Sequence, residues 1–482
     1  MNDVKKAVMT NWRWVMCAML FFATTVNYMD RQVLSLTFKE FIQPEFHWTD
    51  SDYGTITGVF SIAYAIFCLF AGKFIDWMGT KKGYLWAIIV WSLGAVMHAG
   101  CGWVTEQVVG LESKAALLEA TGAIVSSISM VSVWLFLFCR LVLGLGEAGN
   151  LPAAIKVTAE YFPKKDRAFA TALFNAGASV GALAAPATIP LLAKSLGWEW
   201  AFIIIGALGF IWAGIWIFVY DKPEESAHVN EAELEYIHQD EVESQKSKVE
   251  SKEEKQMSFA EAFKHKQTWS FAFGKFMTDG VWWFFLFWAP AYFQDQFGIK
   301  ASDPQGIALI FTLYAIVTVI SLFGGYLPKI FVEKKGMEPY AGRMRAMLIF
   351  AFFPIFALFA QPLGGIYGPW AVAIIIGIVG AAHQSWSANI FSTTGDMFPK
   401  SAVATITGIG AMAGGVGSFL INKGSGMLFD YAAQMGEAFK FAGFTGKPAG
   451  YMIIFCVCAV AYLIGWSVMK LLVPKYKPVV IK

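Results

Sequence analysis

Charged side chains interrupt long apolar stretches of the sequence at two places. Asp30 and Arg31 are adjacent near the end of the first stretch, and Arg140 and Glu147 lie in a later one. A charge in the hydrocarbon core of a membrane costs at least about 2.5–3.5 kcal/mol, so we expect these residues to face a protein interior or a water-filled cavity. Two residues seven positions apart project from the same helix face. Arg140 and Glu147 could therefore form a buried ion pair, or Glu147 could take up and release a coupling proton.

Asp30 and Arg31 cannot form a simple pair with each other, because adjacent residues project about 100° apart on a helix. The planar guanidinium of Arg31 suits a carboxylate ligand. Asp30 could carry a proton or pair with Arg140, and the sequence leaves both alternatives open. Tyr28 and Asn27, just before this pair, could hydrogen-bond to hydroxyl groups.

Two later apolar stretches also carry polar side chains. Lys275 and Asp279 are four residues apart, which suits either a structural ion pair or a second cation for an anionic ligand. His383, Ser385 and Asn389 follow in another stretch. A single histidine is more often a hydrogen-bonding core residue than a ligand contact. Here it accompanies hydroxyl and amide groups at helical spacing, as a site that binds several hydroxyl groups requires.

Aromatic and amide side chains extend this set of candidates. Trp283 and Trp386 could stack on the C–H face of a ligand, although in a chain with 16% aromatic residues most of them pack or face lipid. Asn175 and Ser179 are also four residues apart in a Gly- and Ala-rich stretch. They add a second polar face to the prediction.

The composition is that of a membrane protein. Of the 482 residues, 57% are apolar and only 15% are Asp, Glu, Lys or Arg. The 37 basic and 35 acidic residues give a net charge of +2, so nothing indicates nucleic acid as a partner. The six cysteines lie mostly in apolar runs, and Cys456 and Cys458 would point apart on a helix, so neither a metal nor another cofactor is predicted.

Twelve apolar segments are long enough to cross a bilayer, which requires about 20 residues per helix. Six lie within residues 1–220 and six within 267–482, joined by a charged connector at 221–266 that has too few apolar residues to pack in lipid. We therefore predict an all-α polytopic membrane protein with two six-helix bundles. The expected helices lie near 13–38, 52–76, 83–104, 126–150, 167–193, 199–220, 267–293, 305–331, 344–361, 367–395, 402–428 and 449–473.

Basic residues cluster in the loops on one side of these segments, as at Lys81 and Lys82 or Lys334 and Lys335. The positive-inside rule places these loops, and with them both chain ends, in the cytoplasm. A polar insertion at 105–122 then falls on the outer side.

The two halves resemble each other. Phe162-Pro163-Lys164 opens one Gly- and Ala-rich segment and Phe398-Pro399-Lys400 opens another, and a Val-Gly pair follows each at the same spacing. Chance similarity between helices of this composition is the alternative. The shared topology favours the parallel repeat of a two-bundle transporter.

Two motifs identify a family. Residues 72–82 read GKFIDWMGTKK and include Gly72, Asp76, Gly79 and Lys81, and residues 140–148 read RLVLGLGEA. Gly72 would allow close helix approach, and Asp76 could contact cations or helix N-termini. Together the stretches resemble the two signature motifs of the major facilitator superfamily, and this resemblance covers the whole chain. Trp77 stands where that family commonly has Arg, and Lys329 stands where the second half usually has an acid, which weakens any charge latch in these turns.

Four stretches narrow the resemblance: NYMDRQVLS, RLVLGLGEAGNLPAA, GKFMTDGVWWFFLFWAP and AAHQSWSANIFSTTGDMFP. They resemble the anion:cation symporter branch, most of all bacterial hexuronate transporters. The resemblance implies proton-coupled uptake of an acidic sugar by a monomer in the bacterial cytoplasmic membrane, with Asp30, Glu147 and Arg140 in coupling. The implied substrate-binding residues are Tyr28, Arg31, Tyr64, Asn175, Lys275, Trp283, His383, Ser385, Trp386 and Asn389.

Other functions remain as alternatives. An aldonate or aldarate could be the substrate, and sodium could replace the proton. A membrane enzyme is disfavoured because the chain has no H-E-x-x-H stretch, and a pump driven by ATP is disfavoured because it has no G-x-x-x-x-G-K-[ST] stretch. A sugar sensor would need an output domain, for which the connector at 221–266 is too short.

Overall fold

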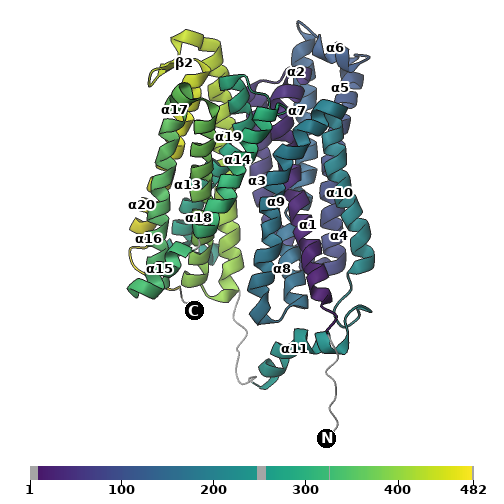
Figure 1. The fold of residues 1–482 in the computed structure, drawn as a ribbon, viewed down its shortest axis with the longest axis vertical. Coiled ribbons are helices and arrows are strands. Elements are labelled where there is room, and N and C mark those ends of the chain that lie inside the picture. The colour runs from purple at the N-terminus through teal and green to yellow at the C-terminus, as the bar shows by residue number, and fades with distance from the viewer. Residues whose placement is uncertain (1–8, 247–256, 325, 480–482) are drawn as a thin grey trace.

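The computed structural model of the protein describes residues 9–246, 257–324 and 326–479. Two groups of long helices stand side by side, and the two ends of the chain lie at the same face of the molecule (Figure 1). We call this the terminal face and the opposite one the distal face. Within the described residues the only strands are β1 (Lys440–Phe441) and β2 (Phe444–Thr445), which pair antiparallel in a short hairpin.

The N-terminal half contains six long helical runs, several of them made of helices placed end to end. They are α1 (Trp12–Thr37), α3 (Asp50–Met78), α4 (Thr80–Met97) continued by η2 (His98–Gly100) and α5 (Cys101–Val109), α7 (Ile124–Glu147) followed by α8 (Asn150–Tyr161), α9 (Lys164–Leu196) and α10 (Trp198–Val219). Short elements on the distal face are η1 (Phe38–Ile42), α2 (Gln43–Phe46) and α6 (Lys114–Leu118).

The C-terminal half repeats this plan. Its runs are α13 (Lys266–Phe297), α14 (Pro304–Gly324) with α15 (Tyr326–Lys335), α16 (Pro339–Phe352) with η3 (Phe353–Phe359) and α17 (Ala360–Tyr367), α18 (Pro369–Met397), α19 (Lys400–Met435) with η4 (Gly436–Ala438), and α20 (Lys447–Leu472). The connector between the halves contains α11 (Glu231–Lys246) and α12 (Phe259–Ala262).

Ten helical runs in the described residues are long and apolar enough to cross a membrane. The two long runs outside this set are α1 and α13, which carry the Asp30–Arg31 and Lys275–Asp279 charges and pack along α9 and α19, respectively. The protein is therefore an all-α membrane protein with twelve transmembrane helices in two six-helix bundles, as predicted.

The internal repeat is visible in the backbone. Phe162 and Phe398 both end a helix in extended conformation, and Pro163 and Pro399 then precede α9 and α19 with nearly identical dihedral angles, φ −63° with ψ 155° and 154°. Proline forces the preceding residue out of helical conformation and has no N–H to donate, so the same three residues make the same turn twice.

Glycines at matching positions of the repeated segments allow close helix packing in each half. A Cβ atom on Gly181 of α9 would lie 2.4 Å from the Thr25 carbonyl oxygen of α1. A Cβ on Gly417, its counterpart in α19, would lie 2.1 Å from the Phe276 carbonyl oxygen of α13. No other residue fits at these backbone contacts, so the sequence repeat corresponds to equivalent helix pairs.

The insertion at 105–122 lies on the distal face, opposite the termini, as predicted (Figure 1). Lys114 of α6 forms ion pairs with Glu45 of α2 at 2.9 Å and with Glu199 at 2.6 Å. Glu45 is buried and also accepts a hydrogen bond from the Trp198 indole at 2.6 Å. Burial raises the pKa of the Glu45 carboxyl above its usual value even though Lys114 counteracts this effect.

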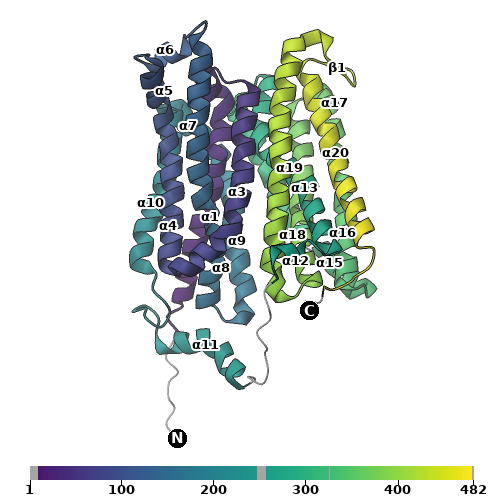
Figure 2. The same ribbon diagram turned by 180° about the vertical axis from the view of Figure 1, so that it is seen from behind.

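The connector is docked onto the N-terminal half. Figure 1 and Figure 2 place α11 beneath that half, at the terminal face. The carboxylate of Glu233 is buried and accepts hydrogen bonds from the Thr10 hydroxyl, from the backbone N–H groups of Trp12 and Arg13, and from the Arg13 guanidinium at 3.0 Å. These amides belong to the first turn of α1, where no partner exists within the helix. The connector therefore caps α1.

Between the halves, the longest contact runs along α3 and α19 (Figure 2). A Cβ on Gly54 would lie 2.5 Å from the Asn422 carbonyl oxygen, and one on Gly415 would lie 2.5 Å from the Ala65 Cβ. Helices α9 and α14 form a second contact, which includes Lys194 and Asp303 at 4.0 Å.

Candidate functional site

Arg31 is the centre of the site. Its side chain is buried, and its Nε donates a hydrogen bond of 2.7 Å to Glu147 Oε2, which joins α1 to α7. Three aromatic rings surround the guanidinium carbon, with centroids at 4.4 Å for Tyr64, 5.3 Å for Tyr28 and 5.7 Å for Trp283. Trp283 belongs to α13 of the other half. The structure thus brings together four of the residues that were predicted to bind substrate, and it does so between the two bundles: Tyr28, Arg31, Tyr64 and Trp283.

The Arg31 guanidinium is only partly used by the protein. Its two terminal nitrogens make no hydrogen bond of normal distance and angle to the described residues, and the Tyr64 hydroxyl lies close to the guanidinium. These nitrogens are not among the fully enclosed unpaired atoms. Glu147 Oε1, by contrast, is enclosed and unpaired. Arg31 can therefore hold Glu147 through Nε and still present a two-pronged donor to a second carboxylate.

Asp30 faces away from Arg31, as the adjacency argument predicts. Its two carboxylate oxygens are buried without a hydrogen-bond partner among the residues that the structure describes, and so are all three guanidinium nitrogens of Arg140. The Arg140–Glu147 ion pair, one of the two alternatives that the sequence left open, does not form, because Glu147 bonds to Arg31 on the other helix. Asp30 and Arg140 also make no direct hydrogen bond. Buried charges of this kind are costly, so they mark a functional region and not a structural clamp.

Trp91, which the sequence reasoning did not select, belongs to this region. The Trp91 side chain is fully buried and its indole nitrogen is unpaired, as is the amide nitrogen of Asn27. The Trp91 indole and the Arg140 guanidinium are both close enough to act on the Asp30 carboxylate. No sequence signal singles out Trp91 among the 19 tryptophans of the chain.

The C-terminal half supplies a separate polar group. Lys275 and Asp279 form an ion pair of 2.8 Å on α13, with side chains that are 5% and 14% exposed. The Lys275 ammonium also lies 4.2 Å from the ring centroid of Phe391. A Cβ on Gly414 of α19 would lie 2.2 Å from Asp279 Oδ2. The structural alternative for Lys275 is therefore present, since its charge is already neutralised by Asp279.

His383 is fixed by two neighbours. Its Nδ1 lies 2.7 Å from the hydroxyl oxygen of Tyr462 on α20, and its ring stacks parallel to Trp282 at a centroid distance of 5.4 Å. Within the described part of the chain, His383 Nε2 has no hydrogen-bond partner, and it is not fully enclosed. Tyr462 was not predicted, because it is one of two tyrosines in the last apolar segment and has no distinctive spacing.

The remaining predicted residues lie apart from Arg31. Trp386 is fully buried edge-on against Tyr462, and the Ser385 hydroxyl donates to the Ala381 carbonyl of its own helix, so both side chains serve packing. Asn175 is exposed on α9. Asn389 donates to the Ser385 carbonyl oxygen.

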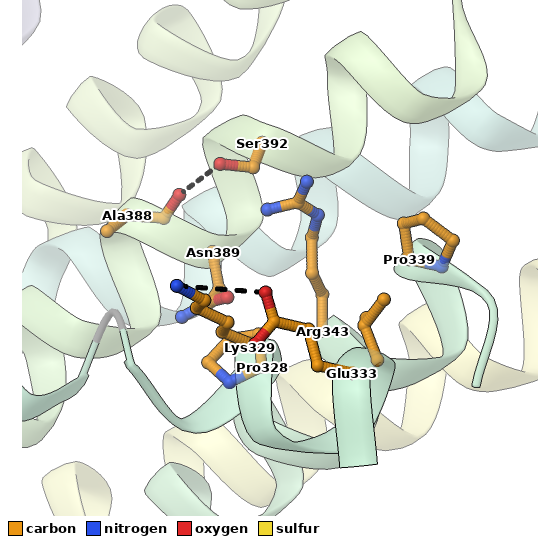
Figure 3. Close-up of a pocket in the computed structure, with 9 residues that line it drawn as sticks. Pro328, Lys329, Glu333, Pro339, Arg343, Ala388, Asn389 and Ser392 are labelled. Carbon is orange, nitrogen blue, oxygen red and sulfur yellow. Dashed lines mark hydrogen bonds and ion pairs between the residues drawn. The ribbon is translucent and has the colours of Figure 1, made fainter. Parts of the chain in front are cut away.

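Asn389 also lines a pocket of about 350 Å³ in the C-terminal half, between α15, α16 and α18 (Figure 3). Arg343 in this pocket donates two hydrogen bonds to Asp396, at 2.7 and 3.3 Å. Lys329, which stands where an acid is usual, is 3.7 Å from Glu333. The pocket's lysine and arginine thus both have acidic partners.

The motif at 72–82 forms the junction of α3 and α4. Asp76 pairs with Lys156 at 2.7 Å and Lys81 pairs with Asp221 at 2.7 Å, so Asp76 contacts a cation as predicted. Gly79 has φ +77°, a conformation that favours glycine at a helix end. The prediction for Gly72 is wrong, since a Cβ there would meet no atom within 4 Å.

Comparison with known proteins agrees with this architecture. Residues 20–421 match the Major Facilitator Superfamily. The chain is 27% identical over 464 residues to the hexuronate transporter of Escherichia coli K12, covering 95% of this chain and 94% of that one. It is 28% identical to the galacturonate transporter of Dickeya chrysanthemi, covering 66% of this chain and 82% of the relative.

A solved structure has the same fold. The crystal structure of a D-xylose–proton symporter superimposes with a TM-score of 0.66 at 15% sequence identity, covering 97% of this chain and 98% of that one. With the family match over most of the sequence, the chain belongs to the Major Facilitator Superfamily and is a multi-pass membrane transporter, not an enzyme.

Proposed function

We propose that this protein is a symporter that brings an acidic sugar of the hexuronate class into the cell together with protons. The observation that carries the proposal is the partly occupied Arg31, whose Nε holds Glu147 while both terminal nitrogens are available. A hexuronate offers one carboxylate for these nitrogens and ring faces for Tyr28, Tyr64 and Trp283. The similarity to a hexuronate transporter and a galacturonate transporter supports the same substrate class.

The Arg31–Glu147 bond suggests how substrate and proton are coupled. While Glu147 is charged, it satisfies the guanidinium charge and competes with an incoming carboxylate. Protonation of Glu147 removes that competition, so proton binding and substrate binding favour each other. Asp30, buried beside Arg140 with no direct partner, is a second proton acceptor in the same half.

The surroundings of the two acids favour a proton over sodium as the coupling ion. Arg31 is bonded to Glu147, and the charge of Arg140 acts on both Glu147 and Asp30. A bound sodium ion would be repelled by two guanidinium groups at short range in a medium of low dielectric constant. A proton only neutralises a carboxylate.

The basic loops support a cytoplasmic position for the terminal face, in the inner membrane of a bacterial cell. In this arrangement the two bundles expose the Arg31 site alternately to either side of the membrane, and residues 221–266 connect the bundles in the cytoplasm. A monomer contains the whole site.

Uptake into proteoliposomes tests the proposal. Glucuronate, galacturonate, galactonate and glucarate would be compared with glucose, with and without an imposed pH gradient, and with a sodium gradient instead. We expect accumulation of a uronate that depends on the pH gradient. Preference for glucose would overturn the carboxylate argument, and dependence on sodium would overturn the coupling ion. Preference for galactonate or glucarate would select the aldonate or aldarate alternative.

Glu147→Gln tests the coupling role directly. This variant should lose accumulation against a gradient while retaining exchange of labelled for unlabelled substrate. Glu112→Gln, at an exposed position on the distal face, is the control and should behave as the parent. Accumulation by Glu147→Gln at the parental level would show that Glu147 is not a coupling group.

A further inference from the structure

Four charged side chains form a closed ring between the halves on the distal face. Lys39 contacts Asp50 at 2.9 Å and Asp295 at 3.1 Å, and Lys447 contacts the same two carboxylates at 2.5 Å each. Each aspartate uses one oxygen for each lysine. All four side chains are between 6% and 17% exposed. Lys39 and Asp50 belong to the N-terminal half, whereas Asp295 and Lys447 belong to the C-terminal half.

Beside the ring, one half caps a helix of the other. The Asp430 carboxylate on α19 accepts hydrogen bonds from the backbone N–H groups of Asp50 at 2.9 Å and Ser51 at 2.7 Å, at the start of α3. Lys423, also on α19, donates to the hydroxyls of Ser51 and Thr55 at 2.9 and 2.6 Å. Amides in the first turn of a helix lack a partner within it and carry partial positive charge. Asp430 supplies both the partner and the opposite charge.

The ring has a property that an ordinary inter-half ion pair lacks. If the halves separate at the distal face, the two crossing contacts, Lys39–Asp295 and Lys447–Asp50, break. The other two contacts, Lys39–Asp50 and Lys447–Asp295, each lie within one half and can persist. None of the four ring charges is then left unpaired, so opening of the ring avoids the large cost of stranding a partly buried ion. Opening still breaks the hydrogen bonds from the start of α3 to Asp430.

We infer that Lys39, Asp50, Asp295 and Lys447, together with the Asp430 cap, form a latch that closes the distal face and reopens by exchanging partners. The inference rests on the proposed alternating access. Packing between α3 and α19 would hold the distal face closed without these ion pairs, whereas the latch closes it through the two crossing contacts. It also requires that the four charges act as one neutral unit.

Two double variants separate the latch from packing. Asp50→Asn with Lys447→Met removes one charge from each half and leaves the crossing pair Lys39–Asp295. Asp50→Asn with Lys39→Met removes both charges from one half and leaves only Lys447–Asp295, which does not cross. Both variants keep the ring neutral, lose two charges and share one substitution.

Distances between spin labels measure the separation of the halves at the distal face without any substrate. Labels at Glu112 and Lys440, exposed on the distal side of either half, would be attached to the full chain after replacement of its six cysteines. The latch predicts that the variant retaining a crossing pair keeps the parental distance distribution. The variant without one should raise the ratio of open to closed distal faces about tenfold, within the usual range of coupling between sites.

Equal behaviour of the two double variants, whether both open or both unchanged, would overturn the latch. If either variant cannot be purified, the mirror pair on the other half replaces it: Asp295→Asn with Lys39→Met, against Asp295→Asn with Lys447→Met. Uptake of uronates by the parent protein is scored separately. A transporter of another substrate can thus still show the latch, and a uronate symporter can still lack it.

Discussion

Replacing Arg31 by lysine keeps the positive charge but removes the geometry that the proposed site needs. A lysine ammonium is a point charge on a flexible stem, whereas arginine offers a planar fork. In the structure, Arg31 bonds Glu147 through Nε at 2.7 Å and has two further nitrogens available. One ammonium at this position cannot hold Glu147 and a substrate carboxylate with the same set of directed bonds.

The size of the effect follows from the bonds lost. Hydrogen bonds that involve a charged group contribute about 1.5–3 kcal/mol each, and Arg31→Lys should cost one of the two that a carboxylate would make. This corresponds to a dissociation constant about 10- to 150-fold higher. Loss of guanidinium stacking against Tyr64, now at 4.4 Å, adds to the weakening.

Equilibrium binding of labelled glucuronate to purified protein, at fixed pH, measures this directly. Arg345→Lys, at an exposed arginine on α16, is the matched control and should bind as the parent does. Thermal unfolding without substrate checks that the Arg31 variant is folded. Parental affinity in a folded Arg31→Lys protein would refute the assignment of the carboxylate to the Arg31 fork.

Two further predictions concern stability. Glu233→Gln removes the buried charge that caps α1 and pairs with Arg13, and it should lower the unfolding free energy by about 3 kcal/mol. Thermal unfolding measures this change. Glu235→Gln, at an exposed position on the same helix, is the control and should have no such effect. Glu45 has a raised pKa because it is buried, so the folded protein binds this proton more tightly than the unfolded chain does. Stability from this group is therefore full below pH 4.5, the ordinary value, and is lost as pH rises through the raised pKa. Glu45→Gln should therefore become more stable relative to the parent as pH rises through that window, and Lys114 keeps Glu199 as a partner in this variant. A difference in unfolding free energy between parent and variant that does not change with pH would contradict this prediction.

The sequence was sufficient for most of the fold. Hydrophobic length located the starts of the membrane helices to within about five residues, because the thickness of a bilayer leaves few alternatives. The α7–α8 run and α19 extend further past their predicted ends, to Tyr161 and Met435. The repeated Phe-Pro-Lys turn predicted equivalent positions for α9 and α19, which their backbone angles and glycine contacts confirm. The error at Gly72 has a simple origin, since a glycine in a family motif was assumed to face another helix.

Side-chain partners between helices were harder to predict. Periodicity places Arg140 and Glu147 on one face of α7, but it contains no information about which helix lies opposite. In the structure α1 brings Arg31 to Glu147, and Arg140 is left without a direct partner. His383 was selected from its polar neighbours in the sequence, whereas its actual partners, Tyr462 and Trp282, come from two other helices.

The position of Trp283 connects the site to the motion of the halves. This ring comes from α13 of the C-terminal half, yet it lies 5.7 Å from the Arg31 guanidinium and 6.3 Å from the ring of Tyr64, both in the N-terminal half. A carboxylate that binds Arg31 would therefore enter at a contact between the halves. A change in that contact would alter the packing of the two bundles against each other. The distal ring depends on the same approach of the two bundles at one end of the molecule. In these two proposals, substrate binding at Arg31 and the exchange of ion-pair partners by Lys39 and Lys447 would both change the separation of the halves. The first would do so at the Arg31 site and the second at the distal face.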